Sequence, residues 1–219
     1  MENNKVKEWV ETIDENFNLH ASKTPGLTAG MNVFKSSGTT YVDSGLSCDT
    51  FNIIHINDGG NVLTENIIEA VPYYRTRQLP YCVWICKENL TENVTAAIDR
   101  LNLKQQNLEP GMILNLDNYV PVQNINHVNA VIGNDVKLIQ DYAEVVAKNW
   151  TPTDLNVLEY YNKTASTILN SNSVKYSIYY EGNKPVSVIE LFSSNDKTAG
   201  LYGLATLESY RGKALELLY

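Results

Sequence analysis

Apolar residues recur along this chain with two different periods, and turn-forming residues separate the segments. Val6, Trp9, Ile13 and Phe17 repeat at helical spacing, which predicts a helix over residues 2–17. The same criteria predict further helices over 65–77, 92–105, 135–148 and 151–169, strands over 31–35, 39–42, 50–57, 81–86, 112–116, 128–132, 174–180, 185–192 and 200–206, and a last helix that begins near Gly212. This mixture predicts an α/β protein with a mixed, mostly antiparallel sheet flanked by helices.

The element pattern also predicts two halves. Residues 118–126 are polar and contain Pro121, which is typical of a linker, so we expect a boundary between residues 1–126 and 127–219. Each half has a helix, then a three-stranded meander, then a helix. No repeat of individual residues accompanies this similarity, so the expected duplication rests on the element pattern.

The amino-acid composition excludes several classes of protein and partner. The chain has 219 residues, 43% of them hydrophobic, which is typical of a folded protein with a sizeable core. The net charge of −8 and the pI of about 4.9 argue against a nucleic-acid or anionic-membrane partner. The apolar runs are too short to cross a bilayer, and residues 1–10 do not resemble a secretory signal. Three cysteines fit a reducing compartment, so we expect a cytoplasmic protein.

Residues 198–213, TAGLYGLATLESYRGK, join an apolar strand to a short loop that contains Arg211, Gly212 and Lys213. This segment resembles the GNAT superfamily of N-acetyltransferases, whose signature is an apolar strand, a loop of the form thr-x-x-x-tyr-arg-gly-lys-gly-x-gly, and a helix. The order of predicted elements from residue 128 onward is similar to the opening of that fold. The two halves resemble family members that carry two tandem copies of the fold, the first of them degenerate.

A phosphate-binding role explains the composition of this loop. A loop that leads into a helix N-terminus points free backbone N–H groups at a phosphate, and glycine allows a close approach. In the family, one strand leaves its neighbour, and its free backbone groups pair with the pantetheine arm of coenzyme A. The resemblance implies acetyl-CoA as co-substrate, with Leu204, Ala205 and Thr206 at the pantetheine and Arg211, Gly212, Lys213 and Ala214 at the pyrophosphate.

The chain also departs from the family pattern. Ala214 stands where the family has glycine, and Glu216 stands where it has glycine or alanine. The pattern stops soon after the start of the family's third helix, so residues 127–219 are expected to form a truncated copy. The corresponding junction of the first half, residues 52–61, has no Arg or Lys and contains Asp58, which would repel phosphate. We therefore expect residues 1–126 to be a degenerate copy.

The resemblance implies an N-acetyltransferase that moves an acetyl group from acetyl-CoA to an amine of a small molecule or peptide. Glu190 lies in an otherwise apolar strand, where a carboxylate that faces the cleft could take the proton of the amine. The alternative is an ordinary paired or edge-exposed strand carboxylate. Tyr202 either lines an acceptor pocket or packs in the core. Tyr160 and Tyr161 are expected to be half-buried at the surface.

A second function class stays open at this point. Ala214, Glu216 and the short C-terminal part are also consistent with a non-catalytic remnant that binds coenzyme A or a protein partner. An exposed sheet edge would then favour a homodimer. Cys82 and Cys86 alternate with Trp84 and are expected to be core thiols. The three histidines are scattered, so we expect no metal site, and no motif supports a Cys–His nucleophile pair.

Overall fold

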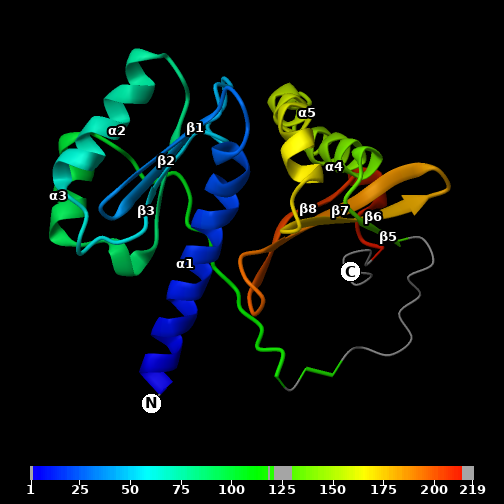
Figure 1. Ribbon diagram of the computed structural model, residues 1–219, viewed down its shortest axis with the longest axis horizontal. Helices are drawn as coiled ribbons and strands as arrows, with labels where there is room; N and C mark the ends of the chain where they lie inside the picture. The colour runs from blue at the N-terminus through cyan, green and yellow to red at the C-terminus, as the bar shows by residue number, and fades with distance from the viewer. Residues whose placement is uncertain (1, 118, 121–129, 214–219) are drawn as a thin grey trace. The chain divides into compact units, whose positions relative to one another are not determined.

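The computed structural model describes residues 2–117, 119–120 and 130–213 of the chain (Figure 1). The chain forms two compact units, Met1–Ile113 and Leu114–Tyr219, and each unit contains its own four-stranded sheet. Both sheets are flanked by helices, which confirms the predicted α/β fold class. The boundary expected between residues 126 and 127 lies outside the described residues.

The first unit has a mixed sheet with the order β1-β2-β3-β4. Its elements are α1 (Glu2–Gly26), β1 (Asn32–Ser36), β2 (Thr39–Asp43), β3 (Ile53–Ile56), α2 (Thr64–Thr76), β4 (Cys82–Ile85), a 3-10 turn (Lys87–Asn89) and α3 (Glu92–Arg100). The pairs β1–β2 and β2–β3 are antiparallel, whereas β3 and β4 run parallel. A parallel pair needs a crossover connection, which α2 supplies.

Residues on the two faces of β3 pack against different helices. Ile54 and Ile56 are fully buried in the core cluster that includes residues of α2 and α3. His55 points to the opposite face because side chains alternate along a strand. There its Nε2 lies 2.9 Å from Asp14 Oδ1 of α1, and the Phe17 ring packs edge-on against the imidazole. Helices thus cover both faces of this sheet (Figure 1).

Asn52 anchors the long connection between β2 and β3. Its side chain is fully buried, and its Oδ1 accepts hydrogen bonds from the backbone N–H and the hydroxyl of Ser44. Its Nδ2 lies 2.8–2.9 Å from the carbonyl oxygens of Leu46, Cys48 and Pro80. The network therefore satisfies carbonyl groups that the loop would otherwise bury without donors.

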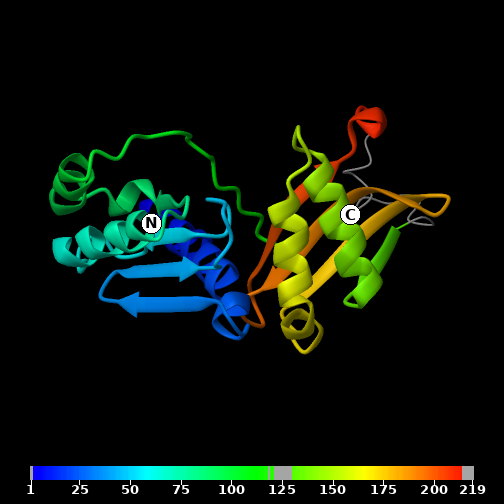
Figure 2. The ribbon, with the colours of Figure 1, turned by 90° about the horizontal axis from the view of Figure 1, so that it is seen from above.

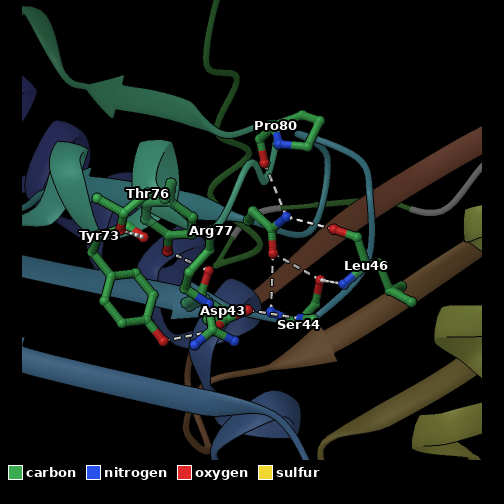
Figure 3. A network of polar contacts seen from close by, with 11 residues as sticks. Asp43, Ser44, Leu46, Tyr73, Thr76, Arg77 and Pro80 are labelled. Carbon is green, nitrogen blue, oxygen red and sulfur yellow. Dashed lines mark hydrogen bonds and ion pairs between the residues drawn. The ribbon is translucent and has the colours of Figure 1, made fainter.

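Asp43, at the end of β2, extends the same network to α2 (Figure 3). The Tyr73 hydroxyl donates to Asp43 Oδ2 at 2.6 Å, and the Arg77 guanidinium lies 3.2 Å from the same oxygen. The backbone N–H of Gly45 donates to the other oxygen, Oδ1. A buried carboxylate with three such donors stabilises the packing of α2 against the sheet.

The second unit has an antiparallel sheet with the order β5-β6-β7-β8. Its elements are β5 (Ala130–Gly133), α4 (Val136–Lys148), α5 (Leu155–Leu169), β6 (Val174–Glu181), β7 (Lys184–Ser193), β8 (Ala199–Thr206) and a 3-10 turn (Glu208–Tyr210). Asp135 and Asp154 cap α4 and α5, since each side chain accepts a backbone N–H of the first helical turn. The two helices lie side by side over one face of the sheet (Figures 1 and 2).

Several predicted bounds are wrong. The first helix continues past residue 17 to Gly26, and α3 ends at Arg100 instead of residue 105. The strand predicted over 112–116 is absent, because no strand of the described chain pairs with this segment, and Met112 is 90% exposed. The last predicted helix is preceded by the turn at 208–210, and its residues from 214 onward lie outside the described chain. Among the helices that the structure describes, none has the length and apolar character to span a bilayer.

The Asn52 network generates a stability prediction. Asn52→Ala removes the two amide N–H groups that the Leu46, Cys48 and Pro80 carbonyls share at a fully buried position, so we expect a loss of about 3 kcal/mol in the free energy of unfolding. Asn61→Ala is the matched control, because the Asn61 amide also bonds to a neighbour, Asp58, but at the exposed surface. The control should lose less than about 1 kcal/mol. Denaturant titrations of the two variants measure both values, and equal losses would contradict the role assigned to Asn52.

Candidate functional site

Glu190 lies in the middle of β7, deep in the second unit. Its side chain faces α4 and α5, and the residue is only 4% exposed. Tyr176 of β6 and Tyr202 of β8 stand directly opposite it in the sheet register. The Tyr161 hydroxyl of α5 donates to Glu190 Oε2 at 3.1 Å. The carboxylate is therefore buried among phenol rings, and at least one hydroxyl solvates it.

The surrounding tyrosines form a ring cluster that includes Tyr142 of α4. The Tyr142 ring lies 5.1 Å from Tyr161 and 4.7 Å from Tyr176, measured between centroids. Burial raises the pKa of Tyr142, Tyr161 and Tyr176 well above the usual value, and the negative charge of Glu190 raises each of them further. Burial is also the main cause that raises the pKa of Tyr160 and Tyr202, and the negative charge of Glu190 raises both further. The phenols thus stay protonated and can serve as donors to the carboxylate.

A β-bulge in β8 lies beside this cluster. The register between β7 and β8 shifts between Val188 and Glu190, and Gly203 in this region has φ of +57°. A Cβ atom on Gly203 would lie 1.8 Å from the Tyr142 hydroxyl oxygen. Glycine is therefore required here twice, for its backbone conformation and for the space that the hydroxyl occupies.

The residues predicted to meet pantetheine lie just after this bulge. Leu204 is exposed, whereas Ala205 and Thr206 are half-buried and pair with Val188 and Ser187 of β7. The sheet order places β8 at an edge, and within the ranges covered by the structure no strand pairs with its outer side. An extended ligand can pair with backbone groups on that side, except that the Thr206 carbonyl already accepts a hydrogen bond from Arg211.

Basic residues gather around the turn that follows β8. Arg211 donates from Nε to the Thr206 carbonyl at 3.1 Å and from Nη2 to Asn149 Oδ1 at 2.6 Å. The ammonium groups of Lys213 and Lys184 lie 4.8 and 5.0 Å from the centroid of the Tyr210 ring.

Glu181 modifies the charge at this turn. Its carboxylate lies 3.9 Å from the Lys213 ammonium, and both side chains are more than half exposed. Gly212 adopts φ of +73°, and Ala214 lies outside the described residues. The turn therefore combines the cations of Arg211, Lys213 and Lys184 with the carboxylates of Glu181 and Glu208 close to the end of β8.

Three features of this site were missed from the sequence. Tyr160 and Tyr161 are each only 8% exposed, so the expectation of half-buried surface rings is wrong. The sequence patterns assign no site role to Tyr142 or to Lys184. The sequence does contain one signal for these residues. A lone glutamate in an apolar strand needs hydrogen-bond donors when it is buried. Tyrosine side chains of the neighbouring helices can supply them, because a phenol ring packs in an apolar core and its hydroxyl donates.

The corresponding junction of the first unit is built differently. β3 pairs with β4 from Ile53–Cys82 to Ile56–Ile85, so the two strands do not separate. In the loop after β3, Asp58 accepts hydrogen bonds from Gly60 and Asn61, and the Asn61 amide is the main cause that lowers the pKa of Asp58. This loop therefore presents an anion where a phosphate site needs donors.

The cysteines and histidines do not form a second site in the described part of the chain. Cys82 and Cys86 are partly buried, and burial raises their pKa to about 12 and about 11, so their thiolates are disfavoured. The Cys86 thiol donates to Glu88, while His55 pairs with Asp14. Among the residues with described positions, no group of three His, Cys, Asp or Glu side chains could hold a metal ion.

The bulge generates a prediction about position 203. Gly203→Ala forces a positive φ on alanine and a clash with Tyr142, so we expect it to cost at least about 3 kcal/mol of stability. Gly182→Ala is the matched control, because Gly182 has φ of +61° but nothing within 4 Å of an added Cβ. The control should cost about 1 kcal/mol. Denaturant unfolding checks both, and similar costs would show that the Tyr142 contact is unimportant.

Comparisons with known proteins agree with this architecture. No protein-family model matches the sequence, and no curated protein matches it. Among solved structures, a GCN5-related N-acetyltransferase from Kribbella flavida aligns with this chain with a TM-score of 0.53 and 12% sequence identity. The alignment covers 90% of this chain and 75% of the Kribbella flavida chain. A functionally unknown conserved protein from Staphylococcus epidermidis ATCC 12228 aligns with a TM-score of 0.48 and 12% sequence identity. This alignment covers 88% of the present chain and 78% of the Staphylococcus epidermidis chain. The match to the Kribbella flavida structure shows that the chain has a GNAT-like, acyl-CoA N-acyltransferase-like fold.

Proposed function

We propose that this protein transfers an acyl group, normally acetyl, from acyl-CoA to an amine, with Glu190 as the general base. The observation that carries the proposal is a buried carboxylate on β7 beside a glycine bulge in the edge strand β8. The GNAT-like fold supports the reaction class, because the structural neighbour from Kribbella flavida is named as an N-acetyltransferase. The acceptor is a small-molecule or peptide amine, and the net charge of −8 favours a cationic one.

In this proposal the coenzyme lies along the outer side of β8. Its pantetheine arm pairs with the backbone of Leu204, Ala205 and Thr206, as an added strand would. Arg211 and Lys213, at the turn after the strand, hold the pyrophosphate, for which charge-assisted hydrogen bonds are the strongest available contacts. The thioester carbonyl then lies beside the bulge, where backbone N–H groups can stabilise the developing oxyanion.

The reaction is a direct displacement on the thioester. The ammonium group of the acceptor first loses a proton to the Glu190 carboxylate. The neutral amine nitrogen then bonds to the acyl carbon, the carbon–sulfur bond breaks, and the amide loses its extra proton to water. The thiolate of coenzyme A leaves and takes a proton from solvent. The protein contributes the base and the alignment of the two reactants.

Calorimetric titration with acetyl-CoA tests the binding step. We expect Arg211→Ala to weaken binding about tenfold or more, since it removes charge-assisted contacts worth about 1.5–3 kcal/mol. Arg100→Ala removes an exposed arginine of α3 in the other unit and should bind like the unchanged protein. If Arg211→Ala and Arg100→Ala bind equally well, the assignment of Arg211 is wrong.

Thiol release from acetyl-CoA, measured across a panel of polyamines, amino acids and peptide amines, tests the chemical step. Glu190→Gln keeps the shape of the side chain but removes the base, so kcat should fall about 10²- to 10⁴-fold while acetyl-CoA affinity stays unchanged. Glu159→Gln, at an exposed position of α5, should retain full activity. Unchanged turnover in Glu190→Gln would refute the role of this carboxylate.

A second candidate function is a protein-interaction module, for which β8 itself supplies the observation. Leu201 and Leu204 are 65% and 54% exposed on a strand at the sheet edge. Such an edge can pair with a second chain, and the expected homodimer remains a prediction. This alternative would replace the enzymatic proposal if acetyl-CoA failed to bind in the calorimetric titration.

A further inference from the structure

We infer that Asn149, at the end of α4, is a positioning residue that holds the Arg211 guanidinium on the outer side of β8 for the pyrophosphate of the coenzyme. This inference rests on the proposed function and deepens it, because it identifies what places the pyrophosphate-binding group before the ligand arrives. It also gives a role to a polar contact between residues that lie 62 positions apart in the sequence.

The register of the last two strands places the Arg211 guanidinium at the outer edge of β8. Ser187 stands opposite Thr206, and in the next pair the Leu207 N–H donates to the Val186 carbonyl. Hydrogen-bonded and non-hydrogen-bonded pairs alternate in an antiparallel ladder, so the Thr206 carbonyl points away from β7. Arg211 Nε donates to this carbonyl at 3.1 Å. The guanidinium therefore lies along the edge at which the coenzyme is proposed to bind.

Asn149 holds the other end of the guanidinium. Its Oδ1 accepts a hydrogen bond from Arg211 Nη2 at 2.6 Å. The Asn149 side chain is itself fixed, because its Nδ2 donates to the Val145 carbonyl of α4 at 2.8 Å. The contact thus ties Arg211 to a helix whose inner face is buried. One acceptor on β8 and one at the end of α4 together define the orientation of the planar guanidinium.

These two contacts leave both the charge and most of the donors of Arg211 for a ligand. A guanidinium has five N–H groups, and two of them are used. Within the described part of the chain, the other three have no acceptor, and no carboxylate forms an ion pair with Arg211. Arg77 of the first unit shows the contrast, because its guanidinium lies 3.2 Å from the Asp43 carboxylate. Arg211 bonds only to neutral oxygens, so its positive charge is not already paired.

Preorganisation links this arrangement to affinity. An exposed arginine that moves freely loses side-chain entropy when a ligand immobilises it, and this loss weakens binding. Arg211 is exposed, and without Asn149 only the hydrogen bond to the Thr206 carbonyl would restrain its guanidinium. We therefore expect Asn149 to raise the affinity for the coenzyme through Arg211, without contacting the pyrophosphate itself.

Asn170 offers a matched control. It ends α5 as Asn149 ends α4, and its Nδ2 donates at 2.8 Å to the carbonyl of Ser166, four residues earlier. Asn149→Leu and Asn170→Leu therefore remove the same kind of helix-end hydrogen bond, but only Asn149→Leu removes an acceptor of Arg211. A difference between the two variants reports the contact with Arg211.

Calorimetric titration with acetyl-CoA tests the positioning role. We expect Asn149→Leu to weaken binding about three- to tenfold, whereas Asn170→Leu should bind like the unchanged protein. In the Arg211→Ala background, Asn149→Leu should cause no further loss, because Asn149 acts only through the guanidinium. A merely structural role would weaken binding by the same factor in both backgrounds. Asn149→Ala removes the same acceptor with a smaller side chain and should give the same results.

Nitrogen-15 NMR tests the hold on Arg211 in the ligand-free protein. The Nε–H signal that Arg211→Ala removes belongs to Arg211. Its hydrogen should exchange with water faster in Asn149→Leu, because one of the two restraints on the guanidinium is lost, but not in Asn170→Leu. The backbone amide signals in the same spectra show whether each variant keeps its fold.

The results separate this inference from the proposed function. If Arg211→Ala weakens acetyl-CoA binding but Asn149→Leu leaves it unchanged or tightens it, the positioning role is overturned and the coenzyme site stands. An unchanged exchange rate of the Arg211 Nε–H in Asn149→Leu would also overturn it. If the unchanged protein does not bind acetyl-CoA, the proposed function is refuted and the inference falls with it.

Discussion

The need to solvate one buried carboxylate organises the second unit. A charged group that is only 4% exposed costs several kcal/mol unless hydrogen-bond donors replace water. Tyrosine meets this need while it also fills apolar space, which explains why α4 and α5 turn phenol rings toward β7. The position of Tyr142 in turn requires glycine at position 203, and that glycine allows the bulge in β8. The helices, the sheet register and the edge strand are thus linked through Glu190.

The first unit meets a similar constraint with a different result. Asp43 and Asn52 are also buried polar groups, but backbone amides, backbone carbonyls and a tyrosine hydroxyl satisfy them within loops and caps. β3 and β4 pair along their whole length, so no strand edge opens between them. The polar network there holds the fold together, whereas the network around Glu190 reaches a strand edge. This contrast is why we place the candidate chemistry in the second unit.

Sequence patterns predicted the fold better than the site. The helical repeat around Tyr142 and the alternation in the last three strands predicted α4 and the meander within a few residues. The strand over 112–116 failed because β-propensity has no effect without a partner edge, and edges are a property of the whole fold. Glu190 could be singled out as a lone charge in an apolar strand. Its partner Tyr161 could not, because the contact joins positions 29 residues apart on different elements.

The contact between Tyr142 and Gly203 also bears on how relatives of this protein can be recognised. At 12% identity, overall similarity to the Kribbella flavida structure is too low to trace descent residue by residue. Tyr142, Tyr161, Glu190 and Gly203 are physically interdependent, so evolution should retain or replace them together. A larger residue at 203 requires a smaller one at 142, and the loss of Glu190 removes the need for both phenols. These four positions therefore form a sequence signature by which relatives can be recognised even when their other residues have diverged.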